Sequence, residues 1–347
     1  MNDSLSRTVL QIDGEPPPPG EAREVAPGIA WLRMPLPFAL DHINLWLIEE
    51  DDGCTLVDCG YGDVATRTQW QRHFETTLAK RPLARIVITH CHPDHVGNAA
   101  WLAARFGCTV TMTQGEYLAA HALIAGHAGY GSADVQALFA RHGMPAEHVV
   151  ELAARGNGYR RGVPEAPQSF SRIIDGDLLK LGGVPWRVVA GYGHSAEHAS
   201  LAAADARVLI AGDMLLPRIS TNVSVWPGEP DADPVQRFLD SLAAFEALPP
   251  DTLVLPSHGL PFRGIAARVA QLAAHHAARL AELQQWLAAS RVPQSAHDVI
   301  PVLFRRAFDV HQRFFAMGEA IAHLNHLWRH RLAERHVADD GAIRFTA

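Results

Sequence analysis

Short apolar runs separated by polar turns dominate the first third of the chain. Residues 43–48 (INLWLI) and 55–58 (TLVD) are two such runs, and the turn signal Asp51-Asp52-Gly53 lies between them. Residues 85–89 are rich in β-branched side chains, which is typical of a buried strand. Helical spacing over residues 63–80 and 96–106 predicts two helices, and residues 109–113 predict another strand. The pattern indicates an α/β fold with several short strands.

Residues 115–170 depart from this pattern. Helices are predicted over 114–125, 132–142 and 146–154, with glycines between them, and the next strand-like run is 170–174. A helical stretch of this length inside a strand-rich chain is interpreted as an insertion that could cap a site.

Strands are predicted again at 186–190, 201–203, 207–210 and 252–255, with a helix near 234–247. From residue 263 onward the pattern is mostly helical. It predicts a helix over 265–288, a second helix capped by Ser295 that runs to residue 306, and a third over 310–331. A hairpin over 335–345, with its turn at Asp340-Gly341, is predicted to follow. These elements predict a catalytic domain over 26–262 and a winged-helix-like domain over 263–347, after a polar, proline-rich lead-in over 1–25.

The composition mainly argues against certain partners and locations of the protein. The chain has 347 residues, 48% of them hydrophobic and 19% charged, with a net charge of −7, so charge alone does not favour a nucleic-acid partner. We find neither a secretory leader nor an apolar run long enough to span a membrane. The four cysteines lack the spacing of a disulfide framework, which favours reduced thiols and a cytoplasmic location.

The candidate chemistry is concentrated at residues 89–95, whose sequence is THCHPDH. His90, His92, Asp94 and His95 follow a predicted buried strand directly. Imidazole and carboxylate are ligands that zinc, iron and manganese accept, and a loop at a strand end can turn closely spaced groups toward one or two ions. A helix could not, because residues on one helical face lie three or four positions apart.

Three later segments share one form, an apolar strand that ends in a ligand-type residue. The residues at these ends are His194, Asp213 and His258. Each segment alone is a weak signal, because a single histidine after a strand is more often structural. Together with the first cluster they predict a metal site assembled at one edge of a sheet.

These motifs resemble those of the metallo-β-lactamase superfamily. The matching sequences are THCHPDH, GHSAEH at 193–198, Gly212-Asp213 and SHG at 257–259. The resemblance implies an αββα sandwich with a dinuclear site. By position, His90, His92 and His194 would hold one divalent metal, Asp94, His95 and His258 would hold the other, and Asp213 would bridge the two. It also implies that Asp58 orients a ligand, and we interpret His198 as a support for the site or as a packing residue.

Two such ions would lower the pKa of a shared water to about 7 and supply a hydroxide that attacks a carbonyl or phosphoryl centre. Asp94 is the predicted catalytic residue, either orienting this nucleophile or carrying a proton to the leaving group. Zinc is the expected metal, and iron or manganese would also suit the ligands.

The branch of the superfamily is indicated by the residue at the bridging position. An aspartate there suits thioesterases, lactonases and phosphodiesterases, and the segments 193–198 and 212–215 look most similar to glyoxalase II. We therefore predict hydrolysis of an acyl thioester or ester of a small molecule. The predicted substrate-contacting residues are Tyr130, Tyr159, Arg160, Arg161 and Met214.

Three alternatives stay open. The first is a nuclease or phosphodiesterase that uses the winged-helix-like tail, although the apolar residues of 310–331 make nucleic acid an unlikely partner. The second is a lactonase, which the absence of a tyrosine directly after Asp213 disfavours. The third is a sensor that binds metal and ligand without catalysis. The apolar helices of the tail suggest a homodimer.

Overall fold

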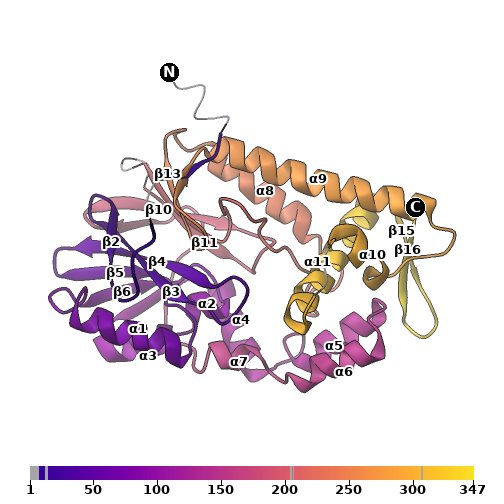
Figure 1. The fold of residues 1–347 in the computed structure, drawn as a ribbon, viewed down its shortest axis with the longest axis horizontal. Coiled ribbons are helices and arrows are strands. Elements are labelled where there is room, and N and C mark those ends of the chain that lie inside the picture. The colour runs from indigo at the N-terminus through magenta and orange to yellow at the C-terminus, as the bar shows by residue number, and fades with distance from the viewer. Residues whose placement is uncertain (1–7, 12–14, 204, 206, 306–307) are drawn as a thin grey trace.

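The computed structural model describes residues 8–11, 15–203, 205, 207–305 and 308–347. Two seven-stranded sheets face each other, and helices cover their outer faces (Figure 1). The first sheet has the order β2-β3-β4-β5-β6-β7-β8. Its strands are β2 Arg23–Ala26, β3 Ile29–Pro35, β4 His42–Glu50, β5 Gly53–Val57, β6 Leu83–Val87, β7 Thr109–Met112 and β8 Ser171–Arg172.

The second sheet has the order β1-β14-β13-β12-β11-β10-β9. It is antiparallel except where β12 pairs with β13. Its strands are β1 Leu10–Gln11, β9 Leu178–Leu181, β10 Val184–Gly191, β11 His198–Ala203, β12 Val208–Gly212, β13 Leu253–Pro256 and β14 Phe262–Arg263.

Side-chain alternation explains why both faces of each sheet are covered. In β4, Trp46 points into the core between the sheets, whereas its neighbours Leu45 and Leu47 pack under the helices. In β12, Ile210 faces the inter-sheet core and Leu209 the helix side. Successive strand residues point to opposite faces, so strands that are apolar throughout need a layer on each side. The predicted αββα sandwich is confirmed.

Helices cover the outer face of each sheet. Helices α1 (Val64–Glu75) and α3 (Ala99–Phe106) lie on the first sheet, and α8 (Pro234–Glu246) and α9 (Ile265–Ala289) lie on the second (Figure 1). The helix predicted over 96–106 is in fact two helices. The short α2 (Pro93–Val96) ends before Asn98, and α3 begins after it. The Asn98 side-chain amide instead donates to the carbonyls of residues 59–61, and it thereby ties this turn to the segment after β5.

The predicted insertion contains α4 (Gln114–Ala125), α5 (Ser132–Arg141), α6 (Ala146–Ala154) and the short α7 (Tyr159–Gly162). Figure 1 shows α5 and α6 beside the C-terminal helices rather than over the sheets. Glu151 of α6 pairs with Arg313 at 2.8 Å, and the His297 amide donates to the His142 carbonyl. The second half of the insertion therefore packs against the C-terminal region.

The C-terminal region holds α10 (Ala296–Leu303), α11 (Val310–Arg329) and the hairpin of β15 (Glu334–Val337) and β16 (Ile343–Thr346). With α9 these are the three helices and the hairpin that the sequence predicted, while the winged-helix assignment stays a prediction. The second helix ends at Leu303, and the predicted end at Arg306 lies outside the described residues. Much of α11 is buried, including Met317, Ile321 and Leu324.

Part of the predicted lead-in joins the sheets. β1 pairs antiparallel with β14, and β2 pairs with β3. Residues 1–7 and 12–14 of this segment lie outside the described residues. Among the helices that the structure describes, none combines the length and the apolarity needed to cross a bilayer.

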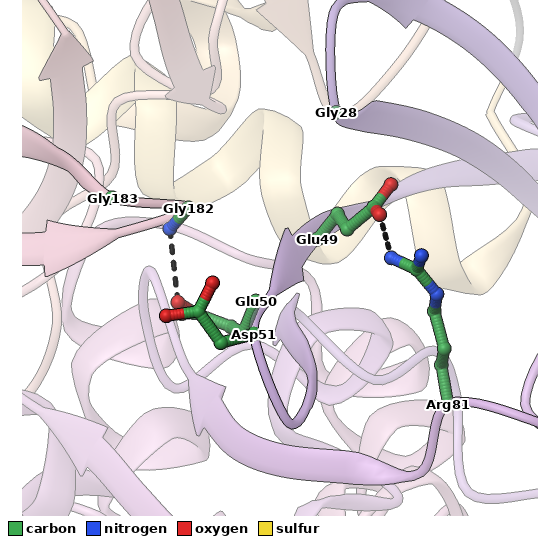
Figure 2. A pocket seen from close by; sticks show the side chains of 7 residues that line it. All are labelled: Gly28, Glu49, Glu50, Asp51, Arg81, Gly182 and Gly183. Carbon is green, nitrogen blue, oxygen red and sulfur yellow. Dashed lines mark hydrogen bonds and ion pairs between the residues drawn. The ribbon is translucent and has the colours of Figure 1, made fainter.

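A polar surface pocket lies where the β4–β5 and β9–β10 turns meet (Figure 2). The Gly182 amide donates to Glu50 at 3.0 Å, and Arg81 pairs with Glu49. Strand β4 begins at His42, whose carbonyl lies beside His258, and ends at this pocket. The contact between Gly182 and Glu50 in Figure 2 thus joins the two sheets at the end opposite to the predicted ligands.

Candidate metal centre

The first cluster gathers three histidines from two loops. His90 and His92 follow β6, and His194 follows β10. His90 Nε2 lies 2.9 Å from His92 Nδ1 and 3.2 Å from His194 Nε2. Together with a carboxylate oxygen of Asp213, these atoms lie within 4.8 Å of one another, which is the spacing of ligands around one ion.

The second cluster contains Asp94, His95 and His258. His258 Nε2 lies 3.4 Å from Asp94 Oδ2, and His95 Nε2 lies 3.7 Å from the same oxygen. Asp94 and His95 share the short helix α2, and His258 follows β13 on the other sheet. The predicted second ligand set is therefore assembled in space.

Asp213 lies between the clusters and directs one oxygen toward each. Its Oδ2 is 3.5 Å from His194 Nε2 in the first cluster. Its Oδ1 is 3.6 Å from His95 Nε2 and 3.4 Å from His258 Nε2 in the second. A carboxylate in this position can share its two oxygens between two cations.

The outer contacts of the rings leave their inner nitrogens free for a cation. His194 Nδ1 lies 2.8 Å from the Asn222 carbonyl, and His258 Nδ1 lies 2.8 Å from the His42 carbonyl. Each Nδ1 therefore carries a proton, and each Nε2 points into its cluster as a candidate ligand atom. His95 Nε2 and Asp213 Oδ1 are buried with no hydrogen-bond partner among the described residues. Buried polar atoms are normally paired, so these two atoms fit a site that receives a metal.

Asp58 holds the second cluster in place, as the resemblance implied. Its carboxylate accepts hydrogen bonds from the amide and hydroxyl of Thr89, both at 2.8 Å, and lies 2.7 Å from His95 Nδ1. It thereby fixes the tautomer and the orientation of the His95 ring.

His198 contacts both the bridging residue and the first cluster, and its ring centroid lies 4.9 Å from that of His90. Its Nε2 accepts a hydrogen bond from the Asp213 amide at 3.2 Å. Gly212 has a φ of +55°, and a Cβ there would lie 2.3 Å from the same nitrogen. The glycine before Asp213 is therefore required by this close approach.

The two clusters differ in charge when no metal is bound. Burial lowers the pKa of His90 far below its usual value and that of His92 to about 3, so both rings are neutral. Burial also acts to lower the pKa of His95, but Asp58, Asp94 and Asp213 outweigh it and raise the pKa to about 9. The second cluster therefore holds protons that a cation must displace.

Glu116, at the start of α4, is a buried residue that sequence reasoning missed. Its carboxylate accepts hydrogen bonds from the Cys91 amide (2.8 Å), the Ser195 hydroxyl (2.6 Å) and the Glu197 amide (2.6 Å). It joins the two loops that carry the first cluster. An acidic residue in the first turn of a helix is too common to single out from the sequence.

Asn222 and Glu319, neither of which was predicted from the sequence, connect the first cluster with the C-terminal region. The Asn222 carbonyl faces His194, and its side-chain amide donates to Glu319 of α11 at 3.0 Å. Burial raises the pKa of Glu319 to about 7. The hydrogen bonds thus run from a candidate ligand into α11.

The predicted substrate residues are placed in different surroundings. The Tyr159 hydroxyl donates to the Cys91 carbonyl at 2.6 Å, so this side chain supports the ligand loop. Met214 is fully buried and packs against Gly191, which leaves it no surface to offer to a substrate. Arg160 and Arg161 are exposed, and Tyr130 is 39% exposed.

Access to the centre is limited. His92 and Asp94 are partly exposed, whereas the other five residues of the two clusters are buried. A substrate would therefore reach the centre past these two side chains.

Comparison with known proteins identifies both regions. The family model described as "Metallo-beta-lactamase superfamily" matches residues 39–258, and "Metallo-beta-lactamase-like, C-terminal domain" matches 280–347. A Burkholderia ambifaria beta-lactamase domain protein is 45% identical, with 99% of each chain covered and a TM-score of 0.89. A metallo-beta-lactamase family protein from Thermus thermophilus is 28% identical, with a TM-score of 0.78 over 93% of this chain and 99% of that one.

Two curated proteins are also similar. A Bacillus subtilis (strain 168) protein described as "Probable metallo-hydrolase YqjP" is 24% identical over 85% of this chain and 90% of its own length. A hydroxyacylglutathione hydrolase of Rhodopseudomonas palustris (strain HaA2) is 27% identical over 51% of this chain and 48% of its own. From the family match and the arrangement of the two clusters, the chain belongs to the metallo-beta-lactamase superfamily.

Proposed function

We propose that this protein is a metal-dependent hydrolase that cleaves an acyl thioester or ester of a small molecule. The observation that carries the proposal is the Asp213 carboxylate, whose two oxygens face two separate sets of imidazoles. The similarity over half the chain to a hydroxyacylglutathione hydrolase, a thioester-cleaving enzyme by its name, favours this substrate class.

In this proposal each cluster holds one divalent cation, and zinc is the expected metal. The residues that would hold the first cation are His90, His92 and His194, and those for the second are Asp94, His95 and His258, with Asp213 shared. When bound, the two cations supply a water that is nucleophilic at neutral pH and offset the negative charge that develops on the substrate oxygen.

The protein's own groups position and transfer protons around this chemistry. Asp94 is the carboxylate of the clusters that is partly exposed, at 19% of its side chain, and it lies on the access side. It is placed to orient the attacking water and to pass its proton to the departing thiol or alcohol. Asp58 and the carbonyls of Asn222 and His42 keep the imidazoles aligned, so little reorganisation is needed during the reaction.

A nuclease function is less well supported by the structure. Residues Met317, Ile321 and Leu324 bury α11 against the rest of the molecule, so this helix is not free to enter a nucleic-acid groove. The remaining alternatives, a lactonase and a sensor, are separated from our proposal by the same assay.

The test is hydrolysis of a panel of acyl thioesters and esters by zinc-loaded protein, with thiol release followed by a chromogenic reagent. We expect turnover by the wild type and a loss of at least about 100-fold in kcat for Asp94→Ala. Asp240→Ala, which removes an exposed carboxylate of α8, is the matched control and should keep full activity. Zinc-loaded protein that is inert toward the whole panel would refute the proposal, and activity on lactones alone would support the lactonase.

A further inference from the structure

A second group of metal-ligand side chains lies outside the centre described above. His326 and His330 are one helical turn apart at the end of α11, and their ring centroids are 4.2 Å apart. Asp233, the residue that precedes α8, reaches both rings. Its Oδ1 is 3.1 Å from His326 Nδ1, and its Oδ2 is 3.2 Å from His330 Nε2. We propose that Asp233, His326 and His330 form a third divalent-metal site, which fastens the start of α8 to the end of α11.

The dimensions fit a zinc-sized ion. Zinc binds imidazole and carboxylate at about 2.0–2.1 Å, so two ligands in a tetrahedron lie about 3.3 Å apart. His326 Nδ1 lies 3.1 Å from one Asp233 oxygen and His330 Nε2 lies 3.2 Å from the other, and one donor atom from each of the three residues lies within 4.8 Å of the others. An ion could therefore enter with small side-chain rotations. Three protein ligands would leave a fourth position for water.

The supporting contacts hold the three ligands in place. The Asp233 carboxylate caps α8 by accepting from the Gln236 amide at 3.0 Å. Directly before His326, the Asn325 side chain donates to the carbonyls of Pro230 and Ala232, at 2.9 and 3.0 Å. The loop before α8 is thereby clamped to α11, and a preorganised ligand set binds an ion more tightly than a mobile one.

Charge and access also suit a cation. The His330 side chain is 42% exposed, so an ion can reach the group from solvent. The C-terminal end of a helix carries partial negative charge, and His330 is the C-cap residue directly after α11. Two nearby arginines are engaged elsewhere, since Arg237 pairs with Glu229 and Arg335 with Asp231.

The position of this group indicates a structural role. The Pro234 carbonyl, directly after Asp233, packs against Gly193, where a Cβ would lie only 2.3 Å from it. Gly193 precedes His194 of the first cluster. A cation on Asp233 would therefore stabilise the docking of α11 beside the loop that carries a ligand of the main centre, without touching a substrate.

The test measures the number of zinc ions that the full-length protein retains per chain. Metal-stripped protein is loaded with excess zinc at about neutral pH, where imidazole is mostly unprotonated, passed through a desalting column and analysed by plasma emission spectrometry. We expect His330→Ala and Asp233→Asn each to retain one zinc fewer per chain than the wild type. Asparagine is also a good helix cap, so Asp233→Asn removes the charge while keeping the cap of α8. His336→Ala, which removes another partly exposed histidine, is the control and should match the wild type.

The proposal is tested by the difference in zinc content per chain between the wild type and each variant, not by the total zinc content. The result therefore does not depend on whether the main centre holds two ions, one or none. Zinc should also raise the Tm of the wild type more than that of His330→Ala. If His330→Ala and Asp233→Asn retain as much zinc as the wild type, the group is a set of hydrogen bonds only and the proposal is wrong. If His330→Ala lowers the Tm of the metal-free protein but leaves the zinc count unchanged, the same conclusion follows.

Discussion

Replacing Glu319 with glutamine should stabilise the metal-free protein above neutral pH. This carboxyl is buried on α11, and burial raises its pKa from 4.5 to about 7. The folded state therefore binds the proton more tightly than the unfolded state does, and the protein loses stability as pH rises from 4.5 through 7. At about 1.4 kcal/mol per pKa unit, the loss amounts to about 3 kcal/mol in the free energy of unfolding. Glutamine keeps the acceptor for Asn222 and cannot ionise.

The assay is urea unfolding of chelator-treated protein, followed by tryptophan fluorescence at several pH values. The stability of Glu319→Gln relative to the wild type should grow from about zero near pH 4.5 to about 3 kcal/mol at about pH 8.5. Glu165→Gln, at an exposed position, is the matched control and should show no such trend. A difference that stays constant across this range would show that Glu319 does not titrate as its burial requires.

Three further predictions concern the metal centre. Asp58→Asn should weaken zinc binding about 10–100-fold, because the ring of His95 loses the carboxylate that orients it; competition with a chromophoric chelator measures this, and unchanged affinity would contradict it. Glu116→Ala leaves two amides and a hydroxyl without their buried acceptor, so the unfolding free energy should fall by about 3 kcal/mol, and an unchanged urea midpoint would count against this role. Zinc should displace protons from His95 and His258, whose pKa values the neighbouring carboxylates raise against the effect of burial. Calorimetry at about pH 7 in two buffers of different ionisation heat should detect their release, and identical heats in both buffers would refute it.

The fold and the candidate ligands could be predicted because their signals are local. Strands such as β4 and β12 are short apolar runs between turn residues, and the ligands follow strands directly. The structure brings all seven predicted ligands into two adjacent clusters. The ligands follow strands of both sheets, and their division into two sets was implied by the resemblance to the superfamily.

The supporting residues could not be predicted, because their partners are distant in sequence. Glu116 joins the loops at Cys91 and Ser195, and Glu319 lies 97 positions from Asn222. Nothing in the composition around either glutamate marks it as buried. Met214 was predicted to contact the substrate, and its side chain is fully buried. An apolar residue beside a ligand can face the substrate or the core, and the sequence does not distinguish the two.

The segment from Asn222 to Val225 has a consequence for how such proteins can be recombined. It lies between a candidate ligand and α11, where the Val225 amide donates to the Gly318 carbonyl and a Cβ on Gly318 would lie 2.8 Å from Ser224. Chimeras that exchange the two family regions at residue 262 would separate these partners. Such a chimera should inherit full metal affinity only if its new tail supplies a glycine and an acidic side chain at the places of Gly318 and Glu319.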